Sequence, residues 1–131
     1  MTITIHRGID QIGGCITEIQ SASGTKILID LGHNLPKGDQ PSEDKYDDES
    51  ELKQLLEGVS AIIYTHYHGD HFAHYYKVPK EIKQYSGKLF KVVAQVVLNF
   101  DRFAHKDHID EANEALDRFI LYKDNRPFYV G

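Results

Sequence analysis

Three histidines and an aspartate stand close together in the middle of the chain, in the order His66-Tyr67-His68-Gly69-Asp70-His71. In an extended backbone residues i and i+2 point the same way, so His66 and His68 can offer two imidazoles to one metal ion. We expect Gly69 to allow a tight turn that directs Asp70 and His71 to a second point beside the first. The spacing therefore predicts a site for one or two metal ions.

The ligand types narrow the choice of metal without deciding it. Imidazole and carboxylate groups together suit zinc, although iron and manganese accept similar sets. For a single histidine, a polar loop with ordinary hydrogen bonds is the better interpretation, whereas four such residues in this pattern favour metal. His74 follows His71 by three residues, on the expected first turn of a short helix that ends before Pro79. We expect it to support the ligands from behind, or to lie at the surface, rather than to bind metal.

The residues before the motif predict strands that carry it to the edge of a sheet. Residues 2–6, 15–20 and 25–30 are rich in β-branched side chains, and glycines separate them. Residues 59–65 form a continuous apolar run of strand length, typical of a strand buried on both faces. The motif follows this run directly, so it is expected at the strand's end.

Between the third and fourth of these strands, residues 34–50 predict a polar surface loop, with a lid over a site as the alternative. Leucines on one face of residues 51–57 indicate a short helix, and Gly58 is expected just after its end.

Two longer helices are predicted in the second half of the chain. Residues 87–104 and 108–121 place apolar side chains at spacings of three and four, and Ser86 is a plausible cap for the first. The few polar residues between them predict a helical hairpin. Residues 127–131 (PFYVG) are interpreted as the start of a further strand.

Composition limits the class of protein. The chain has 131 residues, 40% hydrophobic and 27% charged, which is typical of one domain with one core. Cys15 is the single cysteine, so no disulfide can form within the chain. No apolar run approaches membrane-spanning length and no signal peptide is visible, so we expect a cytoplasmic location and no membrane partner. The net charge of −5 argues against a broad basic face for nucleic acid, while a local basic groove stays open.

The motif, the buried strand before it and the glycine-separated strands resemble the metallo-β-lactamase fold superfamily of hydrolases. The segments ITIHRGIDQIGGCITEI, TKILIDLG and THYHGDH look most like its ribonuclease J-like branch. The resemblance implies an α/β (α+β) fold and covers residues 1 to about 80 well. The chain would be the N-terminal half of an αββα sandwich, with a mixed sheet, helices on one face and a helical hairpin near the C-terminus.

The resemblance also implies roles for individual residues. His66 and His68 would bind the first metal ion, and Asp70 and His71 the second. A hydroxide between the ions would attack an ester, amide or phosphodiester, with Asp70 orienting it. Asp30, at the end of the third strand, would brace the metal loop by hydrogen bonding, although an ordinary turn carboxylate explains it equally well.

Part of the family's ligand set has no counterpart in the sequence. The family adds a histidine, a bridging aspartate and a last histidine, whereas only His105 and His108 follow the motif region here. A complete domain of this kind needs roughly 200 residues or more. We therefore expect residues 1–131 to form a single partial domain that leaves an apolar sheet face exposed, and that pairs with a C-terminal half or with another copy.

The expected function is a metal-dependent hydrolase that uses a metal-bound hydroxide. The branch resemblance favours RNA or another phosphodiester as substrate. A small-molecule ester or amide hydrolase is an alternative, and so is a non-catalytic metal-binding or interaction module.

Overall fold

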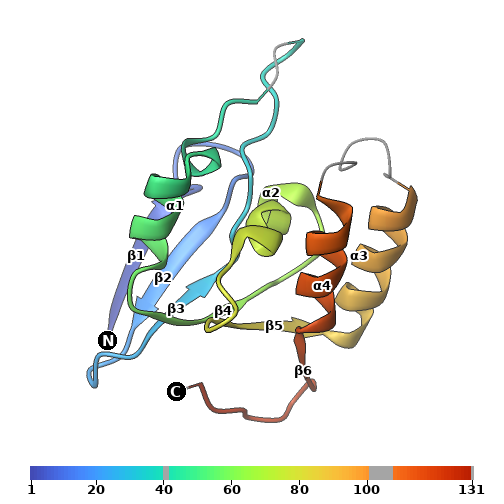
Figure 1. The fold of residues 1–131 in the computed structure, drawn as a ribbon. Coiled ribbons are helices and arrows are strands. Elements are labelled where there is room, and N and C mark those ends of the chain that lie inside the picture. The colour runs from blue at the N-terminus through green and yellow to red at the C-terminus, as the bar shows by residue number, and fades with distance from the viewer. Residues whose placement is uncertain (40–41, 101–107, 131) are drawn as a thin grey trace.

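The computed structural model describes residues 1–39, 42–100 and 108–130, and these residues contain a six-stranded mixed sheet (Figure 1). The strands are β1 (Thr2–Arg7), β2 (Ile16–Gln20), β3 (Lys26–Ile29), β4 (Val59–Ile63), β5 (Lys83–Gly87) and β6 (Ile120–Tyr122). Strands β1, β2 and β3 pair antiparallel, and β3 to β6 pair parallel. The parallel strands therefore end at one common edge of the sheet.

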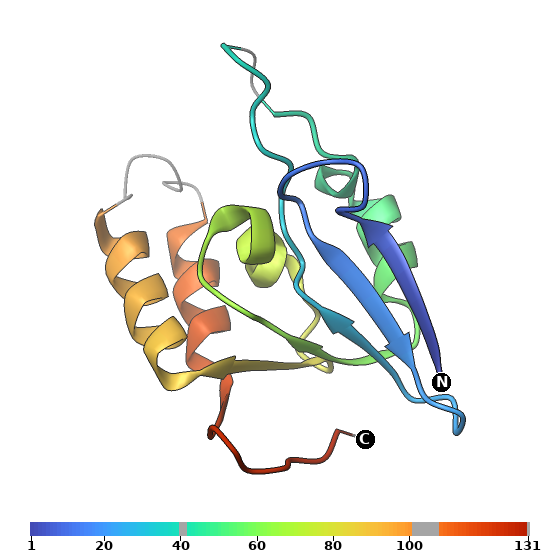
Figure 2. The same ribbon diagram turned by 180° about the vertical axis from the view of Figure 1, so that it is seen from behind.

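The helices lie on one face of this sheet (Figures 1 and 2). They are η1 (Lys45–Asp47), α1 (Glu49–Leu56), α2 (Gly69–Phe72), η2 (Ala73–Lys77), α3 (Lys88–Phe100) and α4 (Ile109–Asp117), where η marks a 3-10 helix. This arrangement, with α3 and α4 side by side near the C-terminus, confirms the predicted fold class. Among the described residues, no helix is both long and apolar enough to cross a bilayer.

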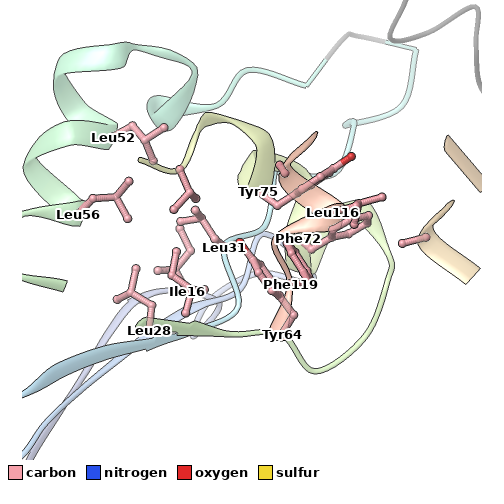
Figure 3. Close-up of a cluster of buried hydrophobic side chains, with 14 of the residues drawn as sticks. Ile16, Leu28, Leu31, Leu52, Leu56, Tyr64, Phe72, Tyr75, Leu116 and Phe119 are labelled. Atoms are coloured by element: carbon pink, nitrogen blue, oxygen red, sulfur yellow. The ribbon is translucent and has the colours of Figure 1, made fainter. Parts of the chain in front are cut away.

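The core lies between the helices and the facing side of the sheet (Figure 3). Ile16, Leu28 and Ile62 come from β2, β3 and β4 and are fully buried. Leu28 and Ile62 are aligned in the register of the two parallel strands, so they present one apolar surface. The helical side chains of the same cluster include Leu52, Leu55, Leu56, Phe72 and Leu116. This shared core fixes the helices relative to the strand ends that carry the motif.

The opposite face of the sheet is also apolar, but it carries no helix. The strand registers align Ile3, Ile19 and Ile27 across β1, β2 and β3 on this face. Ile3 is 57% exposed and Ile5, two residues further on the same strand, is 47% exposed. An apolar sheet face is thus exposed, as the sequence predicted.

Three predictions for the second half of the chain are wrong. Residues 83–87 form β5, so Ser86 lies in a strand and not at the predicted helix cap, and residues 120–122 form β6 instead of the end of the second predicted helix. The two segments pair in parallel, with Tyr85 opposite Ile120, so pairing between distant segments overrides the local helical pattern. Residues 127–130 form no strand. The end predicted for the first long helix, and His105, lie outside the described residues.

Candidate metal centre

The motif occupies the edge where the parallel strands β3 and β4 end. Asp30 follows β3, and its backbone N–H donates to the carbonyl of Ile63, the last residue of β4. The motif then starts at His66, and α2 begins inside it at Gly69. The chain turns at Gly69 as predicted, but the φ of Gly69 is not in the left-handed region, so the turn does not depend on a conformation special to glycine. Instead, the start of a helix turns the chain, because the N–H of His71 donates to the carbonyl of His68 at 2.9 Å.

Three motif side chains converge at this edge. Each of His66, Asp70 and His71 offers a potential ligand atom, and these atoms lie within 4.8 Å of one another. The rings of His66 and His71 are 3.8 Å apart between centroids. His68 stands outside this group of three, but its ring centroid lies 4.9 Å from that of His66. The assignment of all four residues as metal ligands stays a prediction.

Asp30 links the end of β3 to the motif. It is buried, has a left-handed φ of 62°, and accepts hydrogen bonds from the Thr65 N–H at 2.8 Å and the Thr65 hydroxyl at 2.7 Å. Nδ1 of His71 lies 2.7 Å from the same carboxylate. A proton on Nδ1, donated to Asp30, leaves Nε2 of His71 free for a metal ion. Metal-binding histidines in proteins are commonly oriented in this way.

Backbone contacts fix the motif from two neighbouring loops. The N–H of Cys15 donates to the carbonyl of Asp70 at 2.9 Å, and the N–H of Leu31 donates to the carbonyl of His71 at 2.8 Å. A Cβ atom at Gly32 would lie 1.8 Å from the Asp70 carbonyl oxygen, so only glycine allows this approach. The sequence analysis did not identify Gly32 as a site residue. Its position two residues after Asp30 is the signal that could have identified it.

The electrostatics of the site favour a neutral imidazole at His66. Burial, together with the neighbouring imidazoles of His71 and His68, lowers the pKa of His66. Burial and the carboxylates of Asp30 and Asp70 raise the pKa of the Cys15 thiol. Neutral imidazole is the form that binds metal. With a carboxylate beside the imidazoles, the donor set fits a divalent transition metal ion.

His74 lies apart from the motif side chains. It is 1% exposed, and its Nε2 and Nδ1 atoms are nearest to carboxylate oxygens of Asp44 and Asp47, at 3.6 Å and 4.0 Å. The ring of His33 also lies nearby, at 5.3 Å between ring centroids. The structure therefore places His74 in a second cluster, which the sequence analysis did not predict.

Comparison with known proteins agrees with this geometry. The family model of the metallo-beta-lactamase superfamily matches residues 16–83, just over half of the chain. The matched segment runs from β2 into the start of β5 and includes both Asp30 and the complete motif. No match was found among curated proteins. The family match covers more than half of the chain, including strands β2 to β4, Asp30 and the histidine motif, so the chain belongs to the metallo-β-lactamase superfamily.

Proposed function

We propose that the chain is the motif-bearing part of a metal-dependent hydrolase that acts on phosphodiesters, with RNA as the favoured substrate. The superfamily implies a metal-dependent hydrolase fold. The observation that carries the proposal is the convergence of His66, Asp70 and His71 at the ends of parallel strands. Ligands and substrates of α/β proteins commonly bind outside the carboxyl ends of such strands.

The motif residues would have different roles at such a site. His66, His68 and His71 would hold one or two ions, with zinc favoured and iron or manganese as alternatives. A bound ion lowers the pKa of water towards about 7 and stabilises negative charge on the attacked group. Asp70 would supply a carboxylate that binds the ion and accepts a hydrogen bond from the attacking water, and so would orient that water. Asp30 keeps the His71 ring in place through its hydrogen bond to Nδ1.

A groove beside the motif supports a phosphodiester substrate. It has a volume of about 700 Å³ and runs from His66 and Tyr67 to Lys88, Tyr122 and Lys123. The two lysines are exposed and can neutralise phosphate charge, and the tyrosines can stack on bases. The groove also contains the carboxylate of Asp124, so its two lysines outnumber its acidic residues by one on a chain whose net charge is −5. The ribonuclease J-like segments of the sequence favour the same substrate.

We further propose that ligands outside residues 1–131 complete the site. The motif supplies about two protein ligands for each of two ions, whereas catalytic zinc sites hold three. We propose that these additional ligands come from a C-terminal half or from another copy of the chain. We therefore expect the isolated chain to bind zinc weakly and to turn over substrate slowly.

Hydrolysis assays with a generic phosphodiester, a short single-stranded RNA and a nitrophenyl ester test the function. With zinc, iron or manganese added, we expect slow phosphodiester cleavage that disappears in His68→Ala. The variants Lys88→Glu and Lys123→Glu should weaken RNA cleavage several-fold, because each replaces a phosphate-binding charge. Lys53→Glu is the matched control, since Lys53 is an exposed lysine on α1, at the far end of the sheet from α3 (Figure 1).

Each other outcome supports a different function. Preferential cleavage of the ester would identify a small-molecule hydrolase. Metal binding without turnover of any substrate, including after the missing ligands are supplied by a longer chain, would identify a non-catalytic module. Rapid turnover by the 131-residue chain, lost in His68→Ala, would show that the site needs no further ligands.

A further inference from the structure

A second cluster of potential metal ligands lies apart from the motif group and comes from three separate segments. His33 belongs to the loop after β3, Asp47 ends η1, and His74 belongs to η2. One potential ligand atom from each lies within 4.8 Å of the others. The His33 Nε2 to Asp47 Oδ2 distance is 3.0 Å, and the His74 Nδ1 to Asp47 Oδ1 distance is 4.0 Å. The two distances join different oxygens of Asp47, and both are close to the spacing of about 3.3 Å between ligand atoms around a tetrahedral zinc ion.

The burial of His74 is an independent indication of a ligand. The residue is 1% exposed, and its buried Nε2 atom has no hydrogen-bond partner among the described residues. Asp44 Oδ2 is 3.6 Å away, and the Asp44 carboxylate already accepts from Arg7 and from the backbone N–H groups of Asn34 and Tyr46. Burying an imidazole without hydrogen bonds costs free energy. A metal ion on Nδ1 would fix the tautomer that carries Nε2–H, and would polarise this N–H and so strengthen its attraction to the Asp44 carboxylate.

The other imidazole of the cluster is oriented for the same purpose. Nδ1 of His33 lies 2.9 Å from the carbonyl oxygen of Asn34, to which a protonated Nδ1 donates. Nε2 faces Asp47 Oδ2 at 3.0 Å, and because a carboxylate cannot donate, Nε2–H donates this hydrogen bond when no metal is bound. A metal ion would replace that proton and bind Nε2. Both histidines thus place an oxygen acceptor behind one ring nitrogen and the Asp47 carboxylate in front of the other. This is the usual arrangement around a ligating histidine.

We propose that His33, Asp47 and His74 bind a divalent transition metal ion of the zinc class, independently of the HxHxDH motif. Two imidazoles and one carboxylate suit zinc, iron(II) and manganese(II). Asp47 is exposed, so water can complete the coordination from the solvent side. Because the three ligands come from separate segments, the ion would tie the loop after β3 and η1 to η2, which follows α2 in the chain.

Lys77 supplies the competing interaction. Its Nζ atom lies 3.1 Å from Asp47 Oδ1, so without metal the cluster is held by an ion pair. A metal ion must displace this lysine from the carboxylate. Removal of the lysine charge should therefore strengthen metal binding. If the cluster is instead an ion-pair network without metal, the same change would only weaken it.

Metal titration of the full chain in a His66→Ala/His71→Ala background tests the proposal, because this background lacks the motif site. We expect one zinc ion per chain by calorimetry, and a tetrahedral or five-coordinate spectrum with cobalt(II). Adding His33→Gln or Asp47→Asn should lower the affinity about 10-fold or more. Lys77→Gln should raise it several-fold. His6→Gln is the matched control, because His6 is an exposed histidine paired with Glu18 on the sheet.

The proposal fails if this background binds no zinc, or if His33→Gln and Asp47→Asn leave the affinity unchanged. The cluster would then be an ion-pair network only. If the double background does not fold, the same titration is made on the chain with an intact motif. Asp47→Asn should then remove one ion from the stoichiometry, and an unchanged stoichiometry overturns the proposal. Neither readout depends on hydrolytic activity, so the result is independent of the proposed function.

Discussion

Asp44 is the most strongly perturbed carboxylate described in the structure. Its side chain is fully buried, and Arg7 donates a hydrogen bond to it at 2.7 Å. Burial alone would raise the pKa of Asp44. The contact with His74 and the hydrogen bonds from Arg7 and the Tyr46 and Asn34 backbones outweigh burial, so the pKa lies well below its usual value of 3.8. The charged form therefore stabilises the folded chain.

Replacement of Asp44 by asparagine should destabilise the fold by about 3 kcal/mol, because the mostly buried Arg7 then loses its charged partner. The wild-type chain should also show a pH dependence. The pKa is lowered by folding, so the stabilisation is present above about pH 4 and is lost as the pH falls below that value towards the folded-state pKa. Urea unfolding from pH 7 to pH 2 measures both effects.

In Asp44→Asn the part of the pH dependence that comes from this carboxylate should disappear. Asp10→Asn is the matched control, since Asp10 is exposed, and it should change neither the stability nor the profile. Equal acid sensitivity of the wild type and Asp44→Asn would show that Asp44 does not carry the effect.

At the level of single residues, the sequence predicted the part of the site that is local in the chain. His66 to His71 lie within six positions, so their pattern is visible without a fold. His33, Asp44 and Asp47 were missed because only the folded loop brings them to His74. Their neighbourhood depends on backbone geometry that no short sequence pattern encodes.

Among the elements, α1 shows how one glycine sets a helix end. The helix stops at Leu56, and Gly58 follows with a left-handed φ of 72°. A Cβ atom at Gly58 would have no neighbour within 4 Å, so a substitution there tests the backbone conformation alone. The sequence predicted this glycine at the helix end, and the structure confirms it.

Gly58→Ala should lower the free energy of unfolding by about 1 kcal/mol, because an L side chain disfavours the left-handed conformation. Gly58→Asn should cost less, since asparagine tolerates that region better. Urea unfolding of both variants against the wild type measures the difference. Equal stability of the alanine variant and the wild type would show that residue 58 does not adopt a left-handed φ in solution.

The elements that the sequence mispredicted are held by pairing between distant segments. Local periodicity placed residues 120–121 in a helix, yet β6 pairs with β5 and closes the edge of the sheet. A three-residue strand carries too little pattern to compete with the helical spacing next to it. By contrast, β4 and α1 were predicted because their patterns are long enough to identify locally.

At the scale of the whole molecule, the two faces of the sheet differ in what packs on them. The helices cover one face over β2, β3 and β4, whereas within the described residues the opposite face is covered near β5 and β6. There the segment after β6 folds back beneath the sheet (Figures 1 and 2). Phe128 stacks on Tyr85 at 5.1 Å and on Tyr122 at 5.7 Å between ring centroids. The residues predicted to form a strand therefore cover the sheet instead of extending it.

Phe128→Ala should uncover Tyr85 and lower the free energy of unfolding by about 1 to 2 kcal/mol. Phe128 is 40% exposed, so it contributes part of the value of a fully buried aromatic ring, together with its stacking. Binding of a hydrophobic fluorescent dye should increase, because more of the apolar face becomes accessible. Tyr129→Ala is the matched control: Tyr129 is 92% exposed, and its removal should change the stability by less than about 0.5 kcal/mol. If both variants match the wild type in stability and dye binding, the C-terminal segment does not cover this face in solution, and the whole of it is open to solvent.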